Sequence, residues 1–556
     1  MPGSDGSRPS FAVSRSGLPP GLGGVWTTGL ATLAVLVMLA ALLWIVAVNA
    51  FGWFWPARVS EVELDDGSTR VGILMAREAV PAVTENGETE VFRVQLKVGN
   101  RELTREDFLW IDEADIRGRS TPHELVRVVR TEYGDAFGRI VGAVAANGRE
   151  FDLASDSALE GLLESGAEWR SEKRRLENDR QKIRRPLSRL EDRLDLLERS
   201  ARAATPEGRQ EIEELQLEAD EMWNRLAPRL DTLQHDIDDF AERMQAARIV
   251  LQSGPDRFEV PLGNVIEVLW PNQMGSADRV VHAVREGVAF LFTEPREANT
   301  EGGIFPALFG TVLLVLLMSV AVVPLGVVTA VYMTEYARPG ILLRMANQAV
   351  NNLAGVPSIV FGMFGLAFFV YEVGGTIDSV FFADRLPTPT FGTGGVLWAS
   401  LTLALLTVPV VVVATREGLL AVPQSWRDGS LALGATKWQT LKKIILPAAM
   451  PGILTGLILA VSRAAGEVAP LMLTGAVKLA PSLPVDGAPP FLHLQRKFMH
   501  LGFHIYDVSM QSPNVEAAKP MAFATTLVLL GLVVLLNLAA IIVRRRLRRA
   551  YRGQVV

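Results

Sequence analysis

The chain has 556 residues, of which 49% are hydrophobic and 21% charged, with a formal net charge of −6 and a mean hydropathy of +0.24. This composition excludes a wholly soluble protein and a wholly membrane-embedded one, so we expect one membrane domain and one water-exposed domain. The absence of cysteine excludes disulfides and thiolate chemistry. The six histidines show no metal-ligand spacing, so we expect no metal site and no cofactor bound by this chain.

Charge is distributed unevenly along the chain. Residues 57–303 hold 34 Lys and Arg against 50 Asp and Glu, a net charge of −16, so the remainder carries +10. The two parts therefore face different surroundings. The acidity of residues 57–303 also argues against nucleic acid as a partner.

The N-terminal part predicts a tail and a first membrane span. Residues 1–24 are rich in Gly, Pro and Ser without hydrophobic periodicity, which is typical of a disordered segment. Residues 25–56 carry no charge, and 29–50 alone are long enough to cross a bilayer of about 30 Å at about 1.5 Å per residue. The alternative is a signal peptide cleaved near Ala50, but such peptides have apolar cores of about 7–15 residues.

Residues 57–303 predict an α+β domain. Short alternating runs around glycine turns at 62–74, 91–104 and 142–154 indicate β-hairpins, and a similar run follows at 249–272. A charge-dense helical region over about 157–248 separates the third hairpin from the fourth. We therefore expect these helices to be inserted into a small β domain.

Two heptad seams mark the helical region. The break at 204–208 between them predicts an antiparallel helical coiled-coil hairpin within one chain, and a parallel coil that joins two chains is the alternative. The seams consist of Ile183, Leu187, Leu190, Leu194 and Leu197 on one arm, and of Leu226, Leu230, Leu233, Ile237, Phe240 and Met244 on the other.

Hydropathy predicts a membrane domain over 304–543. Its spans fall at about 305–332, 351–371, 396–414, 450–476 and 520–543, which makes six with the first. The fold class is thus an α-helical polytopic membrane protein with an α+β insert. Residues 478–518 hold His493, Arg496, Lys497, His500 and His504, and we expect a solvated loop there rather than a metal site.

Loop charge predicts the orientation, because Lys and Arg favour the cytoplasmic side. The tail 544–556 carries six arginines and no acid, and residues 416–447 carry five cations against two acids. By contrast, residues 372–395 hold three acids and one cation. We therefore place both termini in the cytoplasm and residues 57–303 in the periplasm of a multi-pass inner (plasma) membrane protein.

The polar segment 428–447, DGSLALGATKWQTLKKIILP, lies between two spans. It resembles the EAA loop of ABC importer permeases, in which an acidic-Ala-Ala triplet and a Gly precede Ile-x-Leu-Pro. Here Asp replaces Glu, and Gly and Ser replace the two alanines. The alternative is an ordinary amphipathic loop that places Trp438, Lys442 and Lys443 at the lipid headgroups.

In that family the loop forms a coupling helix that docks on an ATPase. Glycine permits the backbone turn, and proline suits the start of the next helix. The resemblance assigns this coupling role to Asp428, Gly429, Ser430, Leu433, Gly434, Ala435, Leu446 and Pro447.

Two charges lie inside the fifth predicted span, Arg463 and Glu467. A charge at the centre of a spanning helix costs about 2.5–3.5 kcal/mol, so it suggests a polar pathway. If the helix begins near Pro451, Arg463 lies about 18 Å along it, near mid-bilayer, and shares a face with Glu467. A guanidinium can grip phosphate through two hydrogen bonds. The alternative is a structural ion pair that only positions helices.

Four segments together resemble the PstA permease subunits of the high-affinity phosphate ABC importer: TEYA at 334–337, NNLAGVPSIVFGMFGLAFF from residue 351, LALGATKWQT and SRAAGEVAPL. The resemblance covers residues 305–543 and implies a type I ABC importer permease fold. It also implies that Arg463 and Glu467 line the phosphate route. Arg416, at the inner end of the fourth span, could receive the departing anion, although positive-inside anchoring explains it equally well.

The resemblance further implies a non-enzymatic transport subunit that imports inorganic phosphate. Its expected partners are a second, PstC-like permease, a dimer of PstB-like ATPases that binds ATP and Mg²⁺, and a PstS-like phosphate-binding protein outside. The chain has no GxxxxGK[ST] motif, in keeping with ATP hydrolysis on a partner. The alternatives are a permease for molybdate or sulfate, and a signalling scaffold that acts through the coiled coil.

Overall fold

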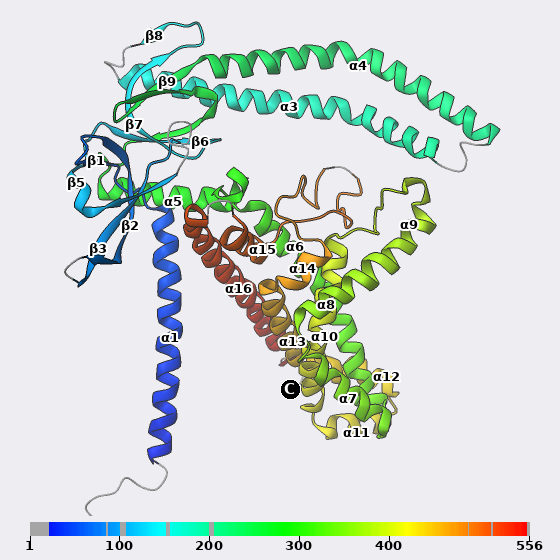
Figure 1. Ribbon diagram of the computed structural model, residues 1–556. Helices are drawn as coiled ribbons and strands as arrows, with labels where there is room; N and C mark the ends of the chain where they lie inside the picture. Colours follow the sequence, from blue (N-terminus) through cyan, green and yellow to red (C-terminus); the bar gives the residue numbers. More distant parts are fainter. Residues whose placement is uncertain are drawn as a thin grey trace, which may run out of the picture.

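The computed structural model describes residues 22–84, 87–100, 107–151, 156–199, 205–487, 489–512 and 515–552. Residues 1–21 of the predicted tail therefore lie outside the described residues, and so do the last four residues of the basic C-terminal segment. Figure 1 shows a bundle of membrane-length helices with an α+β insert at one end. The α+β character predicted for the insert is confirmed.

Six helical segments of the described chain are long and apolar enough to cross a membrane, which confirms the predicted number of spans. They are Trp26–Phe54, Phe305–Tyr336, Ser358–Phe381, Val396–Leu420, Lys437–Gly466 and Ala518–Arg546. The helices that form them are α1 (Leu22–Phe54), α6 (Phe305–Val331), α8 (Ser358–Phe364) with α9 (Gly375–Phe381), α10 (Val396–Leu420), α12 (Lys437–Thr440) with α13 (Leu446–Gly466), and α16 (Val515–Arg552).

The core of the bundle forms where α6, α10 and α13 pack together. Leu314, Leu403 and Ala460 are completely buried there. Small residues allow close approach of the backbones, since a Cβ added at Gly452 would lie 2.6 Å from the Cα of Gly418. The packing of α10 against both neighbours therefore places the fourth span at the centre of the bundle.

The fifth span differs from its prediction as one helix over 450–476. Helix α13 starts earlier, at Leu446, and ends at Gly466, where Glu467 adopts an extended backbone before α14 (Ala469–Thr474) begins. Pro470 explains the interruption, because proline has no N–H to donate to the carbonyl of Gly466 four residues earlier, and its ring would clash with that carbonyl in a continuous helix. Arg463 consequently lies about 26 Å along α13, in its last turn, and not at the middle of the helix.

The third span, predicted at 351–371, starts later, at Ser358, and ends later, at Phe381. It continues past residue 371 as a π-helical segment, Gly365–Gly374, and as α9, so part of the expected acidic loop is helical. Asp378 in α9 is 1% exposed and accepts hydrogen bonds from the backbone N–H groups of Thr390, Phe391 and Gly392. An acid taken as a loop residue thus closes the following turn. The additional helix α7 (Ile341–Leu353) was not predicted.

The prediction of a solvated loop at 478–518 was wrong. His493, His500 and His504 are 7%, 0% and 3% exposed, and residues 501–511 are helical, with α15 spanning Leu501–Tyr506. The backbone N–H of Val396 donates to Arg496, and that of Leu501 to the hydroxyl of Thr311. These long-range bonds hold the segment against the starts of α10 and α6, and sequence periodicity does not reveal such contacts.

The described part of the insert contains two large antiparallel sheets. The strand order is β4-β3-β2-β1-β5 in one, and β10-β9-β7-β6-β11 in the other, with β8 paired to β7. The strands are β1 (Ser60–Leu64), β2 (Thr69–Thr84), β3 (Gly87–Lys97), β4 (Phe108–Asp112), β5 (Ile116–Ser120), β6 (Leu125–Arg130), β7 (Ala136–Val144), β8 (Glu150–Phe151), β9 (Arg248–Ser253), β10 (Asp256–Pro261) and β11 (Val265–Leu269).

Two long helices, α3 (Asp156–Arg199) and α4 (Pro206–Ala246), lie side by side across the top of the bundle in Figure 1. They are inserted between two strands of one sheet, because β7, which precedes them in the chain, pairs with β9, which follows them. Leu187, Leu230 and Ile237 of the heptad seams are buried, and the remaining seam residues are buried or half-buried. Helix α3 also contacts residues 383–385, which follow α9.

Helix α5 (Ser276–Phe292) leads from the insert to the membrane domain. The short strands β12 (Pro295–Arg296) and β13 (Glu301–Gly302) pair with one another between α5 and α6. Phe54 at the end of α1 meets Phe290 of α5 edge-on at 5.4 Å between ring centroids. The joint between insert and bundle is therefore built from α1, α5 and this short ribbon.

A buried carboxylate ties the two sheets together. Asp135 is 3% exposed and contacts Lys97 of β3 at 2.8 Å and Arg127 of β6 at 3.0 Å. Burial alone raises the pKa of Asp135, but the charges of Arg127 and Lys97 outweigh it and hold that pKa below its ordinary range. The folded state therefore favours the ionised carboxylate.

Replacing Asp135 with Asn should destabilise the insert by about 3 kcal/mol, because both cations lose their counter-charge and Lys97 retains some access to water. Since the pKa of Asp135 is lowered, its contribution is complete above pH about 4 and declines at lower pH. Thermal unfolding of the full chain in detergent should therefore show a stability difference between wild type and D135N that decreases from pH 6 to pH 3. Asp112→Asn, at a surface ion pair with Arg93, is the control, and a difference no larger than that of D112N at pH 6 would contradict the assignment.

Candidate functional site

The loop between α10 and α13 forms a rigid turn of two short helices. Helix α11 (Gln424–Ala432) and α12 meet at Gly434, whose φ of +85° lies in the left-handed region that favours glycine. The N–H of Ala435 donates to the carbonyl of Ser430, which closes the turn at 3.2 Å. Figure 1 places α11 and α12 at the end of the bundle opposite the insert.

Side chains brace this turn from inside. Ser430 is buried and shares a hydrogen bond of 2.9 Å with Thr440, so α11 is bound to α12. Thr436 and Gln439 form a capping box at the start of α12. Leu446 and Pro447 begin α13 and are half-buried, as expected for the first turn of a packed helix.

An ion pair anchors the turn to the first span of the membrane domain. Arg427 of α11 lies 2.9 Å from Glu335 at the end of α6, with the two side chains 15% and 18% exposed. Arg427 also donates to the carbonyl of Leu419 at 2.6 Å. The sequence drew attention to Glu335 only as part of the TEYA segment. It did not predict the ion pair, because Glu335 and Arg427 are 92 positions apart and no sequence pattern links them.

The outer face of the turn is exposed. Leu433 is 89% exposed and Trp438 60%, and Gly429 has open space around it. Asp428 accepts a hydrogen bond from Gln424 one turn earlier and otherwise faces solvent. Trp426 and Leu431 of the same turn are also exposed, at 38% and 42%, and several exposed apolar side chains on one turn are typical of a protein contact. The predicted coupling residues thus divide into a buried brace and an exposed tip.

Arg463 and Glu467 meet at the end of α13. The Nε of Arg463 lies 3.3 Å from Oε1 of Glu467, and the side chains are 32% and 18% exposed. Arg463 belongs to the last turn, where a cation stabilises the helix C-terminus, whereas Glu467 lies just beyond it. Within the described residues, neither terminal nitrogen of Arg463 has a hydrogen-bond partner, so both remain available to a ligand.

The neighbouring position is fixed by the last span. Ser462 shares a hydrogen bond of 2.7 Å with Asn537 of α16, which holds the end of α13 in place. Arg416, the third predicted pathway residue, instead bonds Asn347 of α7. No hydrogen bond or ion pair joins Arg416 to Arg463 or Glu467 in the part of the chain described. The structure therefore brings two of the three predicted pathway residues together.

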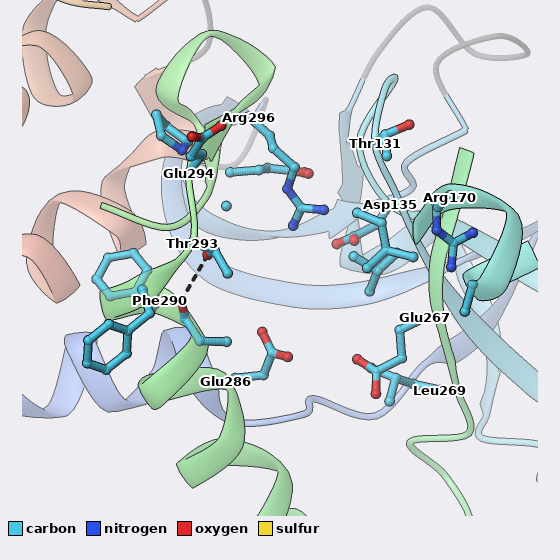
Figure 2. Close-up of a pocket in the computed structure, with 18 of the residues that line it drawn as sticks. Thr131, Asp135, Arg170, Glu267, Leu269, Glu286, Phe290, Thr293, Glu294 and Arg296 are labelled. Carbon is cyan, nitrogen blue, oxygen red and sulfur yellow. Dashed lines mark hydrogen bonds between the residues drawn. The ribbon is translucent and has the colours of Figure 1, made fainter. Parts of the chain in front are cut away.

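A separate cavity of about 1090 Å³ lies in the insert, between the six-stranded sheet, α3 and α5 (Figure 2). None of the predicted site residues lines it. Its wall includes Glu267, His282 and Glu286, which offer ligand atoms within 4.8 Å of one another. The four-residue spacing of His282 and Glu286 is visible in the sequence. The approach of Glu267 to these two residues is not, because Glu267 belongs to a strand of the sheet.

Comparison with known families and proteins places the membrane domain. Residues 322–549 match the family described as "Binding-protein-dependent transport system inner membrane component". The chain is 32% identical over 256 residues to "Probable ABC transporter permease protein YqgI" of Bacillus subtilis, which covers 45% of this chain and 81% of that protein.

Two further relatives carry phosphate in their names. The chain is 39% identical over 172 residues to "Phosphate transport system permease protein PstA 1" of Mycobacterium tuberculosis (31% of this chain, 51% of that protein). It is 32% identical over 214 residues to "Phosphate transport system permease protein PstC" of Xylella fastidiosa (36% and 65%). The matched part thus spans about half to two thirds of these two relatives.

Among solved structures, the chain is similar to the inward-facing MetNI methionine ABC transporter, with a TM-score of 0.31 and 21% identity over 44% of this chain and 94% of that chain.

The Arg427 to Glu335 pair should show energetic coupling. Glu335→Gln leaves a half-buried guanidinium without its counter-charge and should cost about 2 kcal/mol of stability, whereas E335Q/R427Q should cost less than the sum of the single changes. Thermal unfolding of wild type, E335Q, R427Q and the double variant in detergent completes this double-mutant cycle. Glu372→Gln, at an exposed position, is the control and should change stability by less than about 0.5 kcal/mol. Additive penalties would contradict the coupling.

Proposed function

We propose inorganic phosphate as the substrate of this chain, which belongs to the family of binding-protein-dependent transport system inner membrane components and is a permease of an ABC importer. The names of the PstA and PstC relatives support this substrate. The observation that carries the proposal is the half-exposed guanidinium of Arg463, held by Glu467 where α13 ends.

The geometry suits an oxyanion. A planar guanidinium matches two oxygens of a phosphate group with parallel hydrogen bonds. Glu467 contacts Nε and leaves the terminal nitrogens free, so an anion can bind Arg463 without first breaking the ion pair. In the empty pathway the same carboxylate neutralises Arg463, which would otherwise be costly among apolar helices.

Glu467 also favours phosphate over sulfate or molybdate. Near pH 7 phosphate carries at least one proton, whereas sulfate and molybdate carry none. An ionised carboxylate accepts a hydrogen bond from a protonated oxyanion but repels one that has no proton to donate. The carboxylate next to the guanidinium thus supplies discrimination that the guanidinium alone lacks.

Coupling to ATP hydrolysis belongs to the turn at Gly434. We assign its exposed tip, with Leu433 and Trp438, to the contact with a separate ATPase, and the ion pair of Arg427 with Glu335 to transmission of the movement into α6. Closure of two ATPases would then move the spans as packed units. The chain itself hydrolyses no ATP in this scheme.

The orientation follows from charge and arrangement together. The ends of α10 and α16 lie at the same end of the bundle as α11 and α12, opposite the insert (Figure 1). The cation-rich segments at that end belong in the cytoplasm, which leaves the acidic insert in the periplasm. The complete importer would add a second, PstC-like permease, two ATPases and an external phosphate-binding protein.

Replacing Arg463 with Lys keeps the charge but removes the two-pronged donor. Loss of one charged hydrogen bond costs about 1.5–3 kcal/mol, so we expect uptake of ³²P-labelled phosphate by the reconstituted importer to fall by about 10-fold or more. The assay uses vesicles that contain the second permease and the ATPases, with the binding protein outside.

The matched control is Arg338→Lys, which changes an exposed arginine after the first span of the membrane domain and should leave uptake unchanged. Glu467→Gln should narrow the preference for phosphate over sulfate in competition. If R463K transports at the wild-type rate, the pair is structural and the pathway assignment is wrong.

Replacing Leu433 with Glu should separate the permease from its ATPase without harming the fold, because the side chain is 89% exposed. We expect loss of ATPase co-purification from detergent-solubilised membranes, with unchanged thermal unfolding of the chain. Leu217→Glu, at a 64% exposed position of α4, is the control and should retain the ATPase. Retention of the ATPase by L433E would place the contact elsewhere.

A further inference from the structure

Three potential metal ligands converge on the cavity of the insert. His282 and Glu286 lie four residues apart on α5 and so share one face of the helix. Glu267 lies on β11, at the edge of the six-stranded sheet. Figure 2 shows the carboxylates of Glu267 and Glu286 turned toward one another, and one ligand atom from each of the three residues lies within 4.8 Å of the others.

His282 has the properties of a ligand rather than of a packed core residue. It is 8% exposed and lines the cavity, and its imidazole makes no hydrogen bond to another side chain or to the backbone within the described residues. Burial lowers the pKa of His282, with Arg127 acting in the same direction and Glu286 opposing. A neutral ring keeps a lone pair for a metal ion.

We propose that Glu267, His282 and Glu286 bind a divalent transition-metal ion, and that Zn²⁺ fits this set best. Zinc accepts one imidazole and two carboxylates at about 2.0–2.2 Å and takes water as a fourth ligand. Ligands of such a tetrahedron lie about 3.3 Å apart, so small side-chain rotations complete the site. Ca²⁺ and Mg²⁺ are poorer candidates, because they prefer oxygen ligands alone.

The charges around the site allow a cation. Arg285 contacts Oε1 of Glu267, but its side chain is 63% exposed and can turn to solvent, and the second oxygen of Glu267 is not used by that pair. Arg127, one of the cations that line the cavity, is neutralised by Asp135 at 3.0 Å. The two glutamates thus give the site enough negative charge to hold a divalent ion beside one exposed arginine.

The ion would join the insert to the membrane domain. Glu267 belongs to the sheet, whereas His282 and Glu286 belong to the helix that leads into α6. Zinc would therefore fix the angle between them, and the expectation of no metal site, which rested on histidine spacing, would not hold.

The test measures Zn²⁺ binding to the full chain in detergent after treatment with a chelator, by competition with a chromogenic chelator and by metal analysis. We expect one zinc per chain and a higher unfolding temperature with zinc. His282→Gln and Glu286→Gln should each weaken binding by at least about 10-fold and abolish the thermal shift. His123→Gln, at an exposed position of the same insert, is the matched control.

Arg285→Ala guards against a loss caused by misfolding, because it removes an exposed side chain and frees Glu267. It should tighten zinc binding several-fold. The proposal is overturned if wild type binds no stoichiometric zinc, or if H282Q and E286Q fold normally and bind it as wild type does. It is also overturned if those variants misfold and R285A leaves the affinity unchanged.

Discussion

A guanidinium among membrane helices is stable only beside a counter-charge or water, and this constraint shapes the fifth span. Glu467 contacts Arg463 at 3.3 Å, at the point where α13 stops at Gly466 and the backbone of Glu467 becomes extended. The interruption is held from both sides, by Ser462 on Asn537 and by the buried start of α14. The helix break, the ion pair and the free guanidinium nitrogens are therefore parts of one arrangement.

The same bundle links this pair to the opposite end of the membrane domain. Helix α13 runs without interruption from the π-helical segment after α12 to Arg463, so in the proposed coupling this one helix would carry movement of the α11–α12 turn to the ion pair. The ion pair of Arg427 with Glu335 adds a second connection, to α6. At the other end, α5 and the short ribbon join α6 to the insert, whose helices α3 and α4 cross over the bundle (Figure 1).

Local patterns predicted what local physics decides. Hydropathy predicted six spans, glycine turns indicated hairpins, and the segments around Gly434 and Arg463 carried the family resemblance, which the relatives confirm. Features that depend on long-range contacts were missed. Burial of His500 and His504 depends on α6 and α10, and the approach of Glu267 to α5 depends on sheet order. The break after Gly466 had a local signal, Pro470, but the apolar residues around it suggested a continuous helix.

The central claim is that an anion in transit reaches the end of α13. The chain has no cysteine, so a single cysteine at Gly466 reports on that place alone. A side chain there meets no atom within 4 Å, and the position is exposed. In the assembled importer, a charged, membrane-impermeant thiol reagent should modify G466C, and phosphate should slow that reaction. Gly531→Cys, at an exposed position of α16 that we expect to face lipid, is the control and should stay unreactive with and without phosphate. Modification of G466C at the same rate with and without phosphate, or no modification in any nucleotide state, would contradict the account.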